Sequence, residues 1–402
     1  MTNASPRANA PRLGRNVLVL AAVSFLTDAS SEIIYPLLPI FLTTVLGTSA
    51  AAVGAIEGAA ETTSALLKLA SGWWSDRASR RKPLVIAGYA LASLARPLVA
   101  IAQSAAQVLA IRLTDRVGKG IRGSPRDALI AESVDPAIRG RAFGFHRAAD
   151  HAGAVVGPLI AFALLRWEHL PLRTVFLFAA LPGVLSVIVL VLGVRETPRD
   201  ARAPAGSKKA GVPSLDRSLG RAFWIFLGSV LLFTLGNSTD AFLILRANQL
   251  GVSVALVPIL WAALHVVKSA ASVPGGALSD RLGRKPLILA GWVVYAAVYI
   301  GFGRATETWH AWALFLAYGA FFGLTEGTQA ALIADLVGRS RRGTAYGWYY
   351  LAVGIGALPA SVLFGLVWDR VSPRAAFDVG ATLAFAAAVV LLAVRPQRAT
   401  DA

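Results

Sequence analysis

Residues 72–84 read GWWSDRASRRKPL, and residues 276–287 read GALSDRLGRKPL. The two segments share one pattern, in which an Asp-Arg pair precedes an Arg-Lys-Pro sequence. Asp280 follows Asp76 by 204 residues, about half of the 402-residue chain. A polar pattern that returns after half of a chain indicates an internal duplication.

Two further pairs of segments support the duplication. The stretch ALIAESV at 128–134 returns as ALIADLV at 331–337, and RGRAFGF at 139–145 returns as RGTAYGW at 342–348. Both pairs are separated by 203 residues, because the first polar segment is one residue longer than the second. Matches in one register predict that the two halves of the chain have the same fold.

The composition is typical of a helical membrane protein. Hydrophobic residues make up 56% of the chain and charged residues 15%, whereas soluble proteins average roughly 45–50% and about 25%. Apolar runs recur along the chain, for example at 181–194 and 376–394. Such runs match a bilayer core of about 30 Å at a helical rise of about 1.5 Å per residue.

We therefore predict an all-α membrane protein with twelve transmembrane helices. The first apolar stretch contains Asp28 and Glu32 and is longer than the core of a signal peptide, so we expect it to be a retained span. The predicted spans are residues 17–44, 51–74, 84–103, 107–131, 142–165, 172–194, 221–247, 252–278, 285–304, 310–335, 343–368 and 374–394.

The formal charge of +17 is distributed in a way that indicates membrane topology rather than nucleic-acid binding. Lys and Arg are concentrated in the N-terminal tail and the even-numbered connections, whereas the odd-numbered connections around Gly47, Ser104 and Gly251 carry no charge. By the positive-inside rule, both termini are expected in the cytoplasm, with a multi-pass chain in the inner cell membrane. The basic connections are residues 77–82, 139–141, 195–221, 281–285 and 339–342.

The stretch at 196–220 is rich in Pro, Gly, Ser and charge, which is typical of a flexible cytoplasmic linker. It divides the chain into an N-terminal six-helix bundle at 1–195 and a C-terminal six-helix bundle at 221–402. Two parallel repeats of this kind place a cavity at their interface near the middle of the bilayer, a geometry suited to alternating access.

With these features the chain resembles the major facilitator superfamily. The loop motif of that family is G-x-x-x-D-R-x-G-R-K/R; residues 276–285 match it completely, and residues 72–81 match it except at Ser79. The resemblance covers nearly the whole chain. It implies two pseudo-symmetric bundles around a central cavity, in a monomeric secondary transporter that is not an enzyme, uses no cofactor and takes its energy from the proton gradient.

A narrower resemblance is to proton-coupled drug antiporters. Their fifth helix carries the motif G-x8-G-x3-G-P-x2-G-G, whose first positions are matched here by Gly144, Gly153, Gly157 and Pro158. Ala161 and Phe162 stand at the two final glycine positions, and only Arg112 matches the R-x-x-Q-G motif of the fourth helix. This resemblance implies antiport.

The first functional hypothesis is secondary active transport of a small solute, with proton-coupled efflux by alternating access. The alternatives are a proton-coupled importer or uniporter of a small organic anion, a metal-ion exporter, and a receptor that binds without transporting. The sequence has no P-loop, no HExxH motif and no Cys, so neither an ATP-driven pump nor a Cys-ligated metal site is indicated. No metal site is expected.

The duplicated loops are predicted to act as gates at the cytoplasmic face. A carboxylate there can pair with arginines or a helix N-terminus of the opposite half in one state and separate in the other. By pseudo-symmetry, Asp76 should pair with the end of the eleventh helix and Asp280 with the end of the fifth. The alternative is that these residues only determine topology and turns. The proposed gate residues are Asp76, Arg77, Arg139, Arg141, Asp280, Arg281, Arg341 and Arg342.

Charged residues inside the predicted spans form the candidate transport site. A charge at the bilayer centre costs roughly 2.5–3.5 kcal/mol, so each one requires a partner or a water-filled cavity. Carboxylates in a low-dielectric cavity take up protons, and adjacent arginines oppose this uptake. The expected proton-coupling residues are Asp28, Glu32, Glu57, Glu61 and Asp150.

The fourth predicted helix carries five cations within an arc of roughly 120°, at Arg112, Arg116, Lys119, Arg122 and Arg126. Such a stripe favours an anionic or zwitterionic solute, whereas the nearby acids favour a cation or a divalent metal. Static ion pairs are the structural alternative, for example between Asp115 and Arg116. The expected residues of the substrate cavity are Tyr35, Arg112, Arg116, Lys119, His146, Arg147, Asp240, His265, Lys268 and Glu326.

Overall fold

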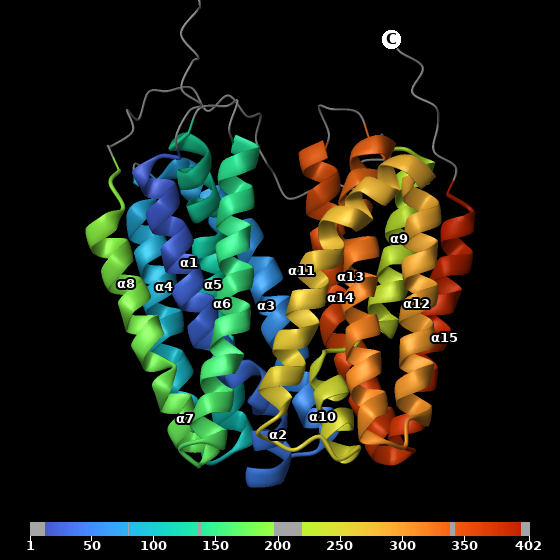
Figure 1. Cartoon of the computed structure of the whole chain (residues 1–402). Helices are drawn as coiled ribbons and strands as arrows, with labels where there is room; N and C mark the ends of the chain where they lie inside the picture. The colour runs from blue at the N-terminus through green and yellow to red at the C-terminus, as the bar shows by residue number, and fades with distance from the viewer. Residues whose placement is uncertain (1–12, 79, 135–138, 197–218, 338–341, 395–402) are drawn as a thin grey trace, which may run out of the picture.

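The structure is a computed structural model that describes residues 13–78, 80–134, 139–196, 219–337 and 342–394. Within these ranges all regular secondary structure is helical. The long helices run side by side along the height of the molecule, as Figure 1 shows. The predicted linker at 196–220 lies almost entirely outside the described residues.

The helices of each half follow the predicted spans. In the first half they are α1 (Arg15–Ile34), η1 (Tyr35–Leu37), α2 (Leu38–Ile40), η2 (Phe41–Val45), α3 (Ala50–Arg77), α4 (Lys82–Ala95), η3 (Arg96–Ile101), α5 (Ala105–Glu132), α6 (Arg139–Arg166), α7 (Leu172–Phe178) and α8 (Ala180–Gly193). In the second half they are α9 (Arg221–Gly236), α10 (Ala241–Gln249), α11 (Val257–Leu282), α12 (Arg284–Arg304), α13 (Thr308–Leu336), α14 (Arg342–Arg370) and α15 (Pro373–Leu392).

Several spans that the sequence predicted as continuous contain breaks. In the first span, Pro36 and Pro39 each lack a backbone N–H, and the helix changes to 3₁₀ and π turns there. In the seventh span, residues 237–240 separate α9 from α10. One polar side chain of this break bonds to the local backbone, since the Ala241 N–H donates to Thr239 Oγ1 at 3.3 Å.

Nine helical segments among the described residues are long and apolar enough to cross a membrane. The other long helices are α3, α5 and α13, with 28, 28 and 29 residues. Helices α3 and α5 carry many of the charged residues of the candidate site, which lowers their hydropathy.

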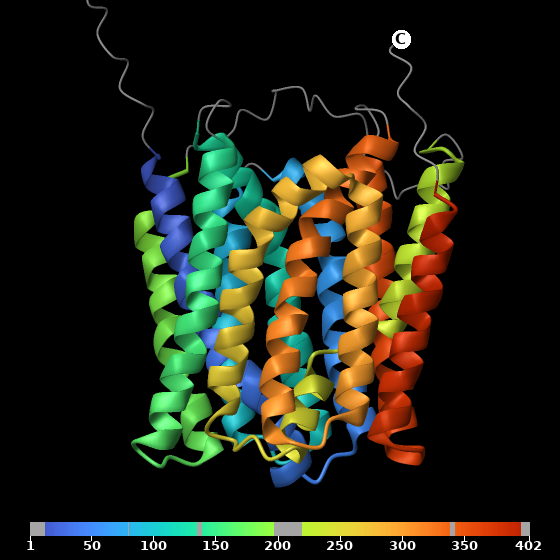
Figure 2. The same cartoon turned by 45° about the vertical axis from the view of Figure 1, so that its right-hand side comes forward.

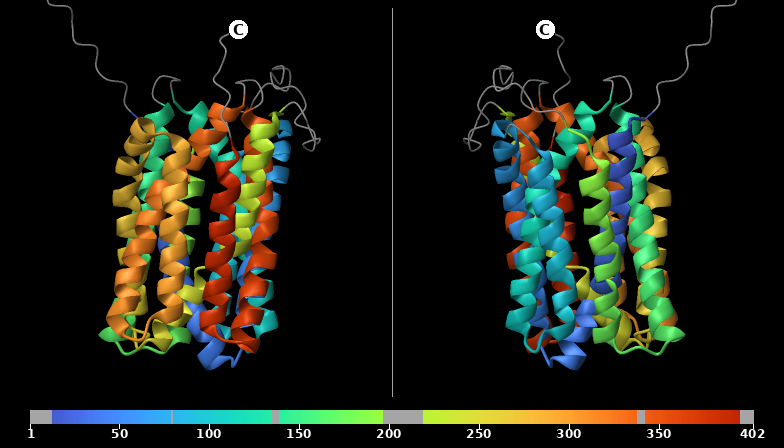
Figure 3. Two further views of the ribbon diagram at one scale, coloured as in Figure 1. Left: turned by 90° about the vertical axis from the view of Figure 1, so that its right-hand side faces the viewer. Right: turned by 90° about the vertical axis from the view of Figure 1, so that its left-hand side faces the viewer.

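The helices of the two halves gather on opposite sides of the molecule (Figures 1 and 3). In the first half, α1 packs against α6 and α8, and α5 packs against α3 and α4. In the second half, α12 packs against α13 and α15, and α9 against α15. The two sides meet where α3 packs against α14 and where α6 packs against α11.

Small residues allow a close approach of α3 and α14. A Cβ atom added to Gly58 would lie 2.7 Å from the Cα of Leu358, and one added to Gly365 would lie 2.5 Å from the Cα of Ala51. Real Cβ atoms do not come so close to backbone, so a side chain at either glycine would force the two helices apart.

The end of the molecule opposite the start of α1 is closed by packing. Leu38 and Phe41 of the first half lie in one buried apolar cluster with Phe242 of α10. Figure 2 shows α2 and α10 together at this end. The contact is completed by Asp369 of α14, whose carboxylate accepts the N–H groups of the first two residues of α3, Ala50 and Ala51, at 3.1 and 2.8 Å. A carboxylate at a helix N-terminus is stabilised by the helix dipole.

Replacing Asp369 by Ala is expected to loosen this closed end, because two charge-assisted hydrogen bonds are lost, at a cost of about 1.5–3 kcal/mol. The chain has no Cys, so a single Leu38→Cys residue, at a position that is 1% exposed, reports on opening. We expect maleimide labelling of this cysteine to become several-fold faster. Asp378→Ala, which removes the surface partner of Arg304, is the control. Equal labelling rates in both variants would show that Asp369 does not hold this end closed.

Candidate functional site

The core of the site is a buried ion pair between α3 and α5. Arg112 Nε donates to Glu57 Oε1 at 3.0 Å, and Arg112 Nη2 donates to Glu57 Oε2 at 2.6 Å. The side chains are 8% and 3% exposed. A two-point contact of this kind holds both groups in one orientation and compensates the loss of hydration.

Asp115 connects this pair to two further helical elements. Its carboxylate lies 2.8 Å from Arg96 Nε of η3, 3.6 Å from Arg112 Nη1 and 3.9 Å from Arg116 Nη1. Arg96 also donates to the carbonyl of Thr27 on α1 at 3.0 Å. From the sequence, Asp115 was expected only as a local partner of Arg116 and not as a residue of the site. In the structure it is the buried centre of a network that joins α1, η3 and α5.

One turn further along α3 and α5, the side chains of the site become exposed to solvent. Arg116 Nη2 lies 2.9 Å from Glu61 Oε1, and the Glu61 side chain is 51% exposed. Lys119 and Asp28 are partly exposed and their side chains form no ion pair or hydrogen bond with any described residue. Static pairing therefore accounts for Arg112 and Arg116 but leaves Lys119 available for a ligand.

Residues of α1 and α11 meet across the two halves. Trp261 Nε1 donates to Glu32 Oε2 at 2.8 Å. The Trp261 ring lies 5.2 Å from the Tyr35 ring and 5.1 Å from the His265 ring, centroid to centroid. The Arg112 guanidinium lies 5.6 Å from the Tyr35 ring centre. Sequence reasoning selected Glu32, Tyr35 and His265 but missed Trp261, because an apolar helix face gave no signal for this tryptophan.

The second half contributes two more polar groups. Lys268 Nζ lies 3.6 Å from Glu326 and 3.9 Å from the Phe322 ring centre. At the break between α9 and α10, Asp240 accepts a hydrogen bond from the Tyr318 hydroxyl at 2.7 Å. Sequence reasoning selected the charged members of both contacts, and the aromatic partners are found only in the structure.

The remaining predicted residues lie toward the end of the molecule where α6 begins. His146 Nδ1 and Arg147 Nη1 each lie 3.6 Å from the Asp150 carboxylate. Arg147 is 70% exposed, whereas His146 is buried. Two members of the predicted cationic stripe point elsewhere: Arg122 stacks over the Tyr89 ring at 4.1 Å, and Arg126 pairs with Asp127 at 2.9 Å.

The predicted gate residues fall mostly outside the described side chains. These are Asp76, Arg77, Arg139, Arg141, Asp280, Arg341 and Arg342, and Arg281 is described as exposed. Their predicted pairing across the two halves stays a prediction.

The Arg-Lys-Pro part of each duplicated loop is described, and its contacts are duplicated. Lys82 Nζ donates to the carbonyls of Val191 and Val194 at 2.9 and 2.7 Å. Lys285 Nζ donates to the carbonyls of Leu392 and Val394 at 2.6 and 2.8 Å. In each half, a lysine therefore binds carbonyl groups at the C-terminal end of the last helix, where the helix dipole favours a cation.

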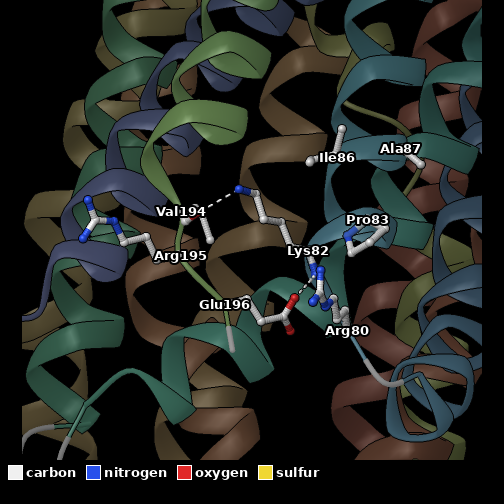
Figure 4. Close-up of a pocket in the computed structure, with 8 residues that line it drawn as sticks. All are labelled: Arg80, Lys82, Pro83, Ile86, Ala87, Val194, Arg195 and Glu196. Atoms are coloured by element: carbon white, nitrogen blue, oxygen red, sulfur yellow. Dashed lines mark hydrogen bonds between the residues drawn. The ribbon is translucent and has the colours of Figure 1, made fainter. Parts of the chain in front are cut away.

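The arginines that precede these lysines also have equivalent partners in the two halves. Arg81 pairs with Glu132 at 2.5 Å and Arg284 with Asp335 at 3.5 Å; these are the acids of the ALIAESV and ALIADLV repeats. In the first half, Glu196 accepts the N–H groups of Arg81 and Lys82 at 2.7 and 2.8 Å. Glu196 and Lys82 line a cavity of about 610 Å³, and Figure 4 shows the two side chains there. These contacts explain why the Arg-Lys-Pro sequence occurs in both halves.

The Major Facilitator Superfamily family model matches residues 20–267 and 225–402, and the chain belongs to this family. It is 34% identical over 393 residues to an uncharacterised MFS-type transporter of Methanocaldococcus jannaschii, covering 96% of each chain. It is 31% identical over 193 residues to the multidrug resistance protein MdtH of Aeromonas hydrophila, covering 47% of this chain and 48% of MdtH. The fold is similar to that of a bacterial homologue of the human lysosomal transporter Spinster in an inward-facing conformation, with a TM-score of 0.71 at 19% identity and 94% coverage of both chains. The protein is thus a membrane-embedded transporter, not an enzyme, and works in a lipid bilayer on a small solute.

Proposed function

We propose that the chain is a proton-coupled exporter that exchanges protons for a small solute by alternating access. The observation that carries this proposal is the clustering of carboxylates and cations from α1, α3 and α5 at the place where the two halves meet, with Glu32 bonded to Trp261 of the other half at 2.8 Å. A carboxylate in this position can couple its protonation to the relative movement of the halves.

The proposal includes the architecture in which this movement takes place. Twelve spans form two six-helix bundles, at 1–195 and 221–402, with both termini in the cytoplasm and the chain in the inner cell membrane as a monomer. The end opposite the start of α1 is closed by apolar packing and by Asp369, whereas Glu61 and Glu326 are 51% and 65% exposed. This combination supports a state that is open to the cytoplasm. The energy source is the proton gradient, and no cofactor takes part.

Efflux is supported by the relationship to a protein named for multidrug resistance. Import or facilitated diffusion of a small organic anion is the second candidate. It is favoured by Lys119 on α5, which has no ion pair among the described residues. It is also favoured by 28% identity over 266 residues to a probable 4-methylmuconolactone transporter of Cupriavidus pinatubonensis, covering 63% of this chain and 61% of that one.

The test uses the purified chain in proteoliposomes that contain a pH-sensitive dye. With an imposed pH gradient, a panel of small solutes is added, and proton movement and solute flux are recorded together. Antiport predicts proton movement opposite to the solute and a loss of accumulation when a protonophore collapses the gradient. Solute flux that ignores the gradient would favour the uniporter, and co-movement of protons and solute would favour the importer.

A further inference from the structure

Two oppositely charged side chains of the candidate site have no partner in the part of the chain that the structure describes. Lys119 of α5 and Asp28 of α1 form no side-chain ion pair or hydrogen bond with the described residues, although Arg116, one turn before Lys119, pairs with Glu61 at 2.9 Å. Thr27, next to Asp28, and Asp115, one turn before Lys119, both contact Arg96, and Lys119 and Asp28 are both partly exposed. The two side chains therefore belong to neighbouring parts of α5 and α1, and both are accessible to a ligand.

An aromatic surface lies next to this charged pair. Glu32, one turn after Asp28 on α1, accepts the hydrogen bond of Trp261. The rings of Tyr35 and His265 flank Trp261 at 5.2 and 5.1 Å. Trp261 is 4% exposed and the rings of Tyr35 and His265 are partly exposed, so a further ring would reach Trp261 alongside these two rings, and aromatic pairs at such separations attract each other.

His265 adds an unused hydrogen-bonding group to this surface. Both of its ring nitrogens are buried and have no hydrogen-bond partner among the described residues. A neutral imidazole carries one donor and one acceptor, and a buried polar group without a partner costs about 1–3 kcal/mol. A polar ligand atom beside Trp261 would remove this cost.

We infer that the solute is a small zwitterion with an aromatic body. Its carboxylate binds Lys119, its ammonium group binds Asp28, and its ring packs against Trp261 and Tyr35. A simple anion would leave Asp28 unpaired and a simple cation would leave Lys119 unpaired, so neither satisfies both charges. This inference rests on the proposal that the cluster between the halves is the transport site, and it names the class of solute that the site takes.

The test compares three probes that share an indole ring: L-tryptophan with both charges, tryptamine with only the ammonium group, and indole-3-propionate with only the carboxylate. Binding to the purified full-length protein is measured by calorimetry at one pH and without a membrane gradient. The zwitterion is expected to bind at least about tenfold more tightly than either analogue, since each charged contact contributes about 1.5–3 kcal/mol.

Three variants separate the contacts. Lys119→Gln should lower the affinity for L-tryptophan to that for tryptamine, and Asp28→Asn should lower it to that for indole-3-propionate. Trp261→Leu should weaken all three probes by a similar factor. The control is Asp378→Asn on α15, which alters a surface pair with Arg304. Elution of each variant as a single symmetrical peak shows that it has folded.

The inference is wrong if tryptamine or indole-3-propionate binds as tightly as L-tryptophan, or if none of the three probes binds. Equal loss of affinity for all probes in Lys119→Gln would also contradict it, because that pattern indicates a structural effect. A failure of proton coupling is distinguishable from these outcomes, since it would leave the order of the three binding affinities unchanged.

Discussion

Glu57→Ala is expected to lower the free energy of unfolding by about 3–5 kcal/mol, because removal of one partner leaves the other charge of a buried pair uncompensated. Arg112 and Glu57 are both less than one-tenth exposed and are joined by two hydrogen bonds. The measurement is unfolding of the detergent-purified protein by denaturant or heat, followed by circular dichroism or intrinsic tryptophan fluorescence.

The matched control is Glu326→Ala, which removes a carboxylate that is 65% exposed and 3.6 Å from Lys268. Exposed pairs contribute about 0–1 kcal/mol, so this variant should unfold close to the parent. A Glu57→Leu/Arg112→Leu double variant should be more stable than Glu57→Ala, since it removes both charges. If the two single variants were equally stable, the buried pair would contribute no more than a surface contact.

The positions of the helices could be predicted from local sequence, because the length of an apolar run sets the length of a span. The predicted spans 285–304 and 374–394 correspond to α12 (Arg284–Arg304) and α15 (Pro373–Leu392). The break at 237–240 was not predicted, since the apolar run continues on both sides of it. Its signal was the run of polar residues from Asn237 to Asp240, whose side chains compete with helical hydrogen bonds.

The charged network could be predicted only in part. Glu57 and Glu61 are four residues apart on α3, and Arg112 and Arg116 are four apart on α5. The first acid pairs with the first arginine and the second acid with the second arginine. Equal spacing allows this because the two helices run in the same direction. Residue types and spacing thus indicated the helix faces, but lateral packing determines which side chains meet.

Contacts between the halves could not be predicted from the sequence, because they too depend on how the helices pack side by side. The bond between Glu32 and Trp261 joins residues 229 positions apart, and no periodicity relates two such positions. Within the second half, the tyrosine whose hydroxyl binds Asp240, Tyr318, was likewise indistinguishable from other aromatic residues of an apolar helix. A tyrosine or tryptophan in an apolar run signals burial, whereas its polar atom finds a partner only after the helices have packed.

Glu32→Gln is expected to abolish net transport driven by a pH gradient while solute exchange continues. The carboxylate of Glu32 accepts the Trp261 N–H from the opposite half at 2.8 Å, and the amide oxygen of glutamine can accept the same hydrogen bond. The glutamine amide does not ionise near neutral pH, however. The contact between the halves is therefore kept, while the group that takes up and releases the coupled proton is lost. Exchange needs no net release of protons and therefore survives.

Two assays on the same proteoliposomes test this expectation: net efflux under an imposed pH gradient, and counterflow of labelled solute without a gradient. We expect the first to fall at least about tenfold, the loss associated with removing a positioned proton-transfer group being about 10²–10⁴-fold, and the second to stay near the parent rate. Asp378→Asn should change neither. Gradient-driven efflux at the parent rate would remove Glu32 from the coupling mechanism and favour the uniporter. Loss of both activities would mean that Glu32 is needed for the movement of the halves, with the proton carried by another carboxylate of the site.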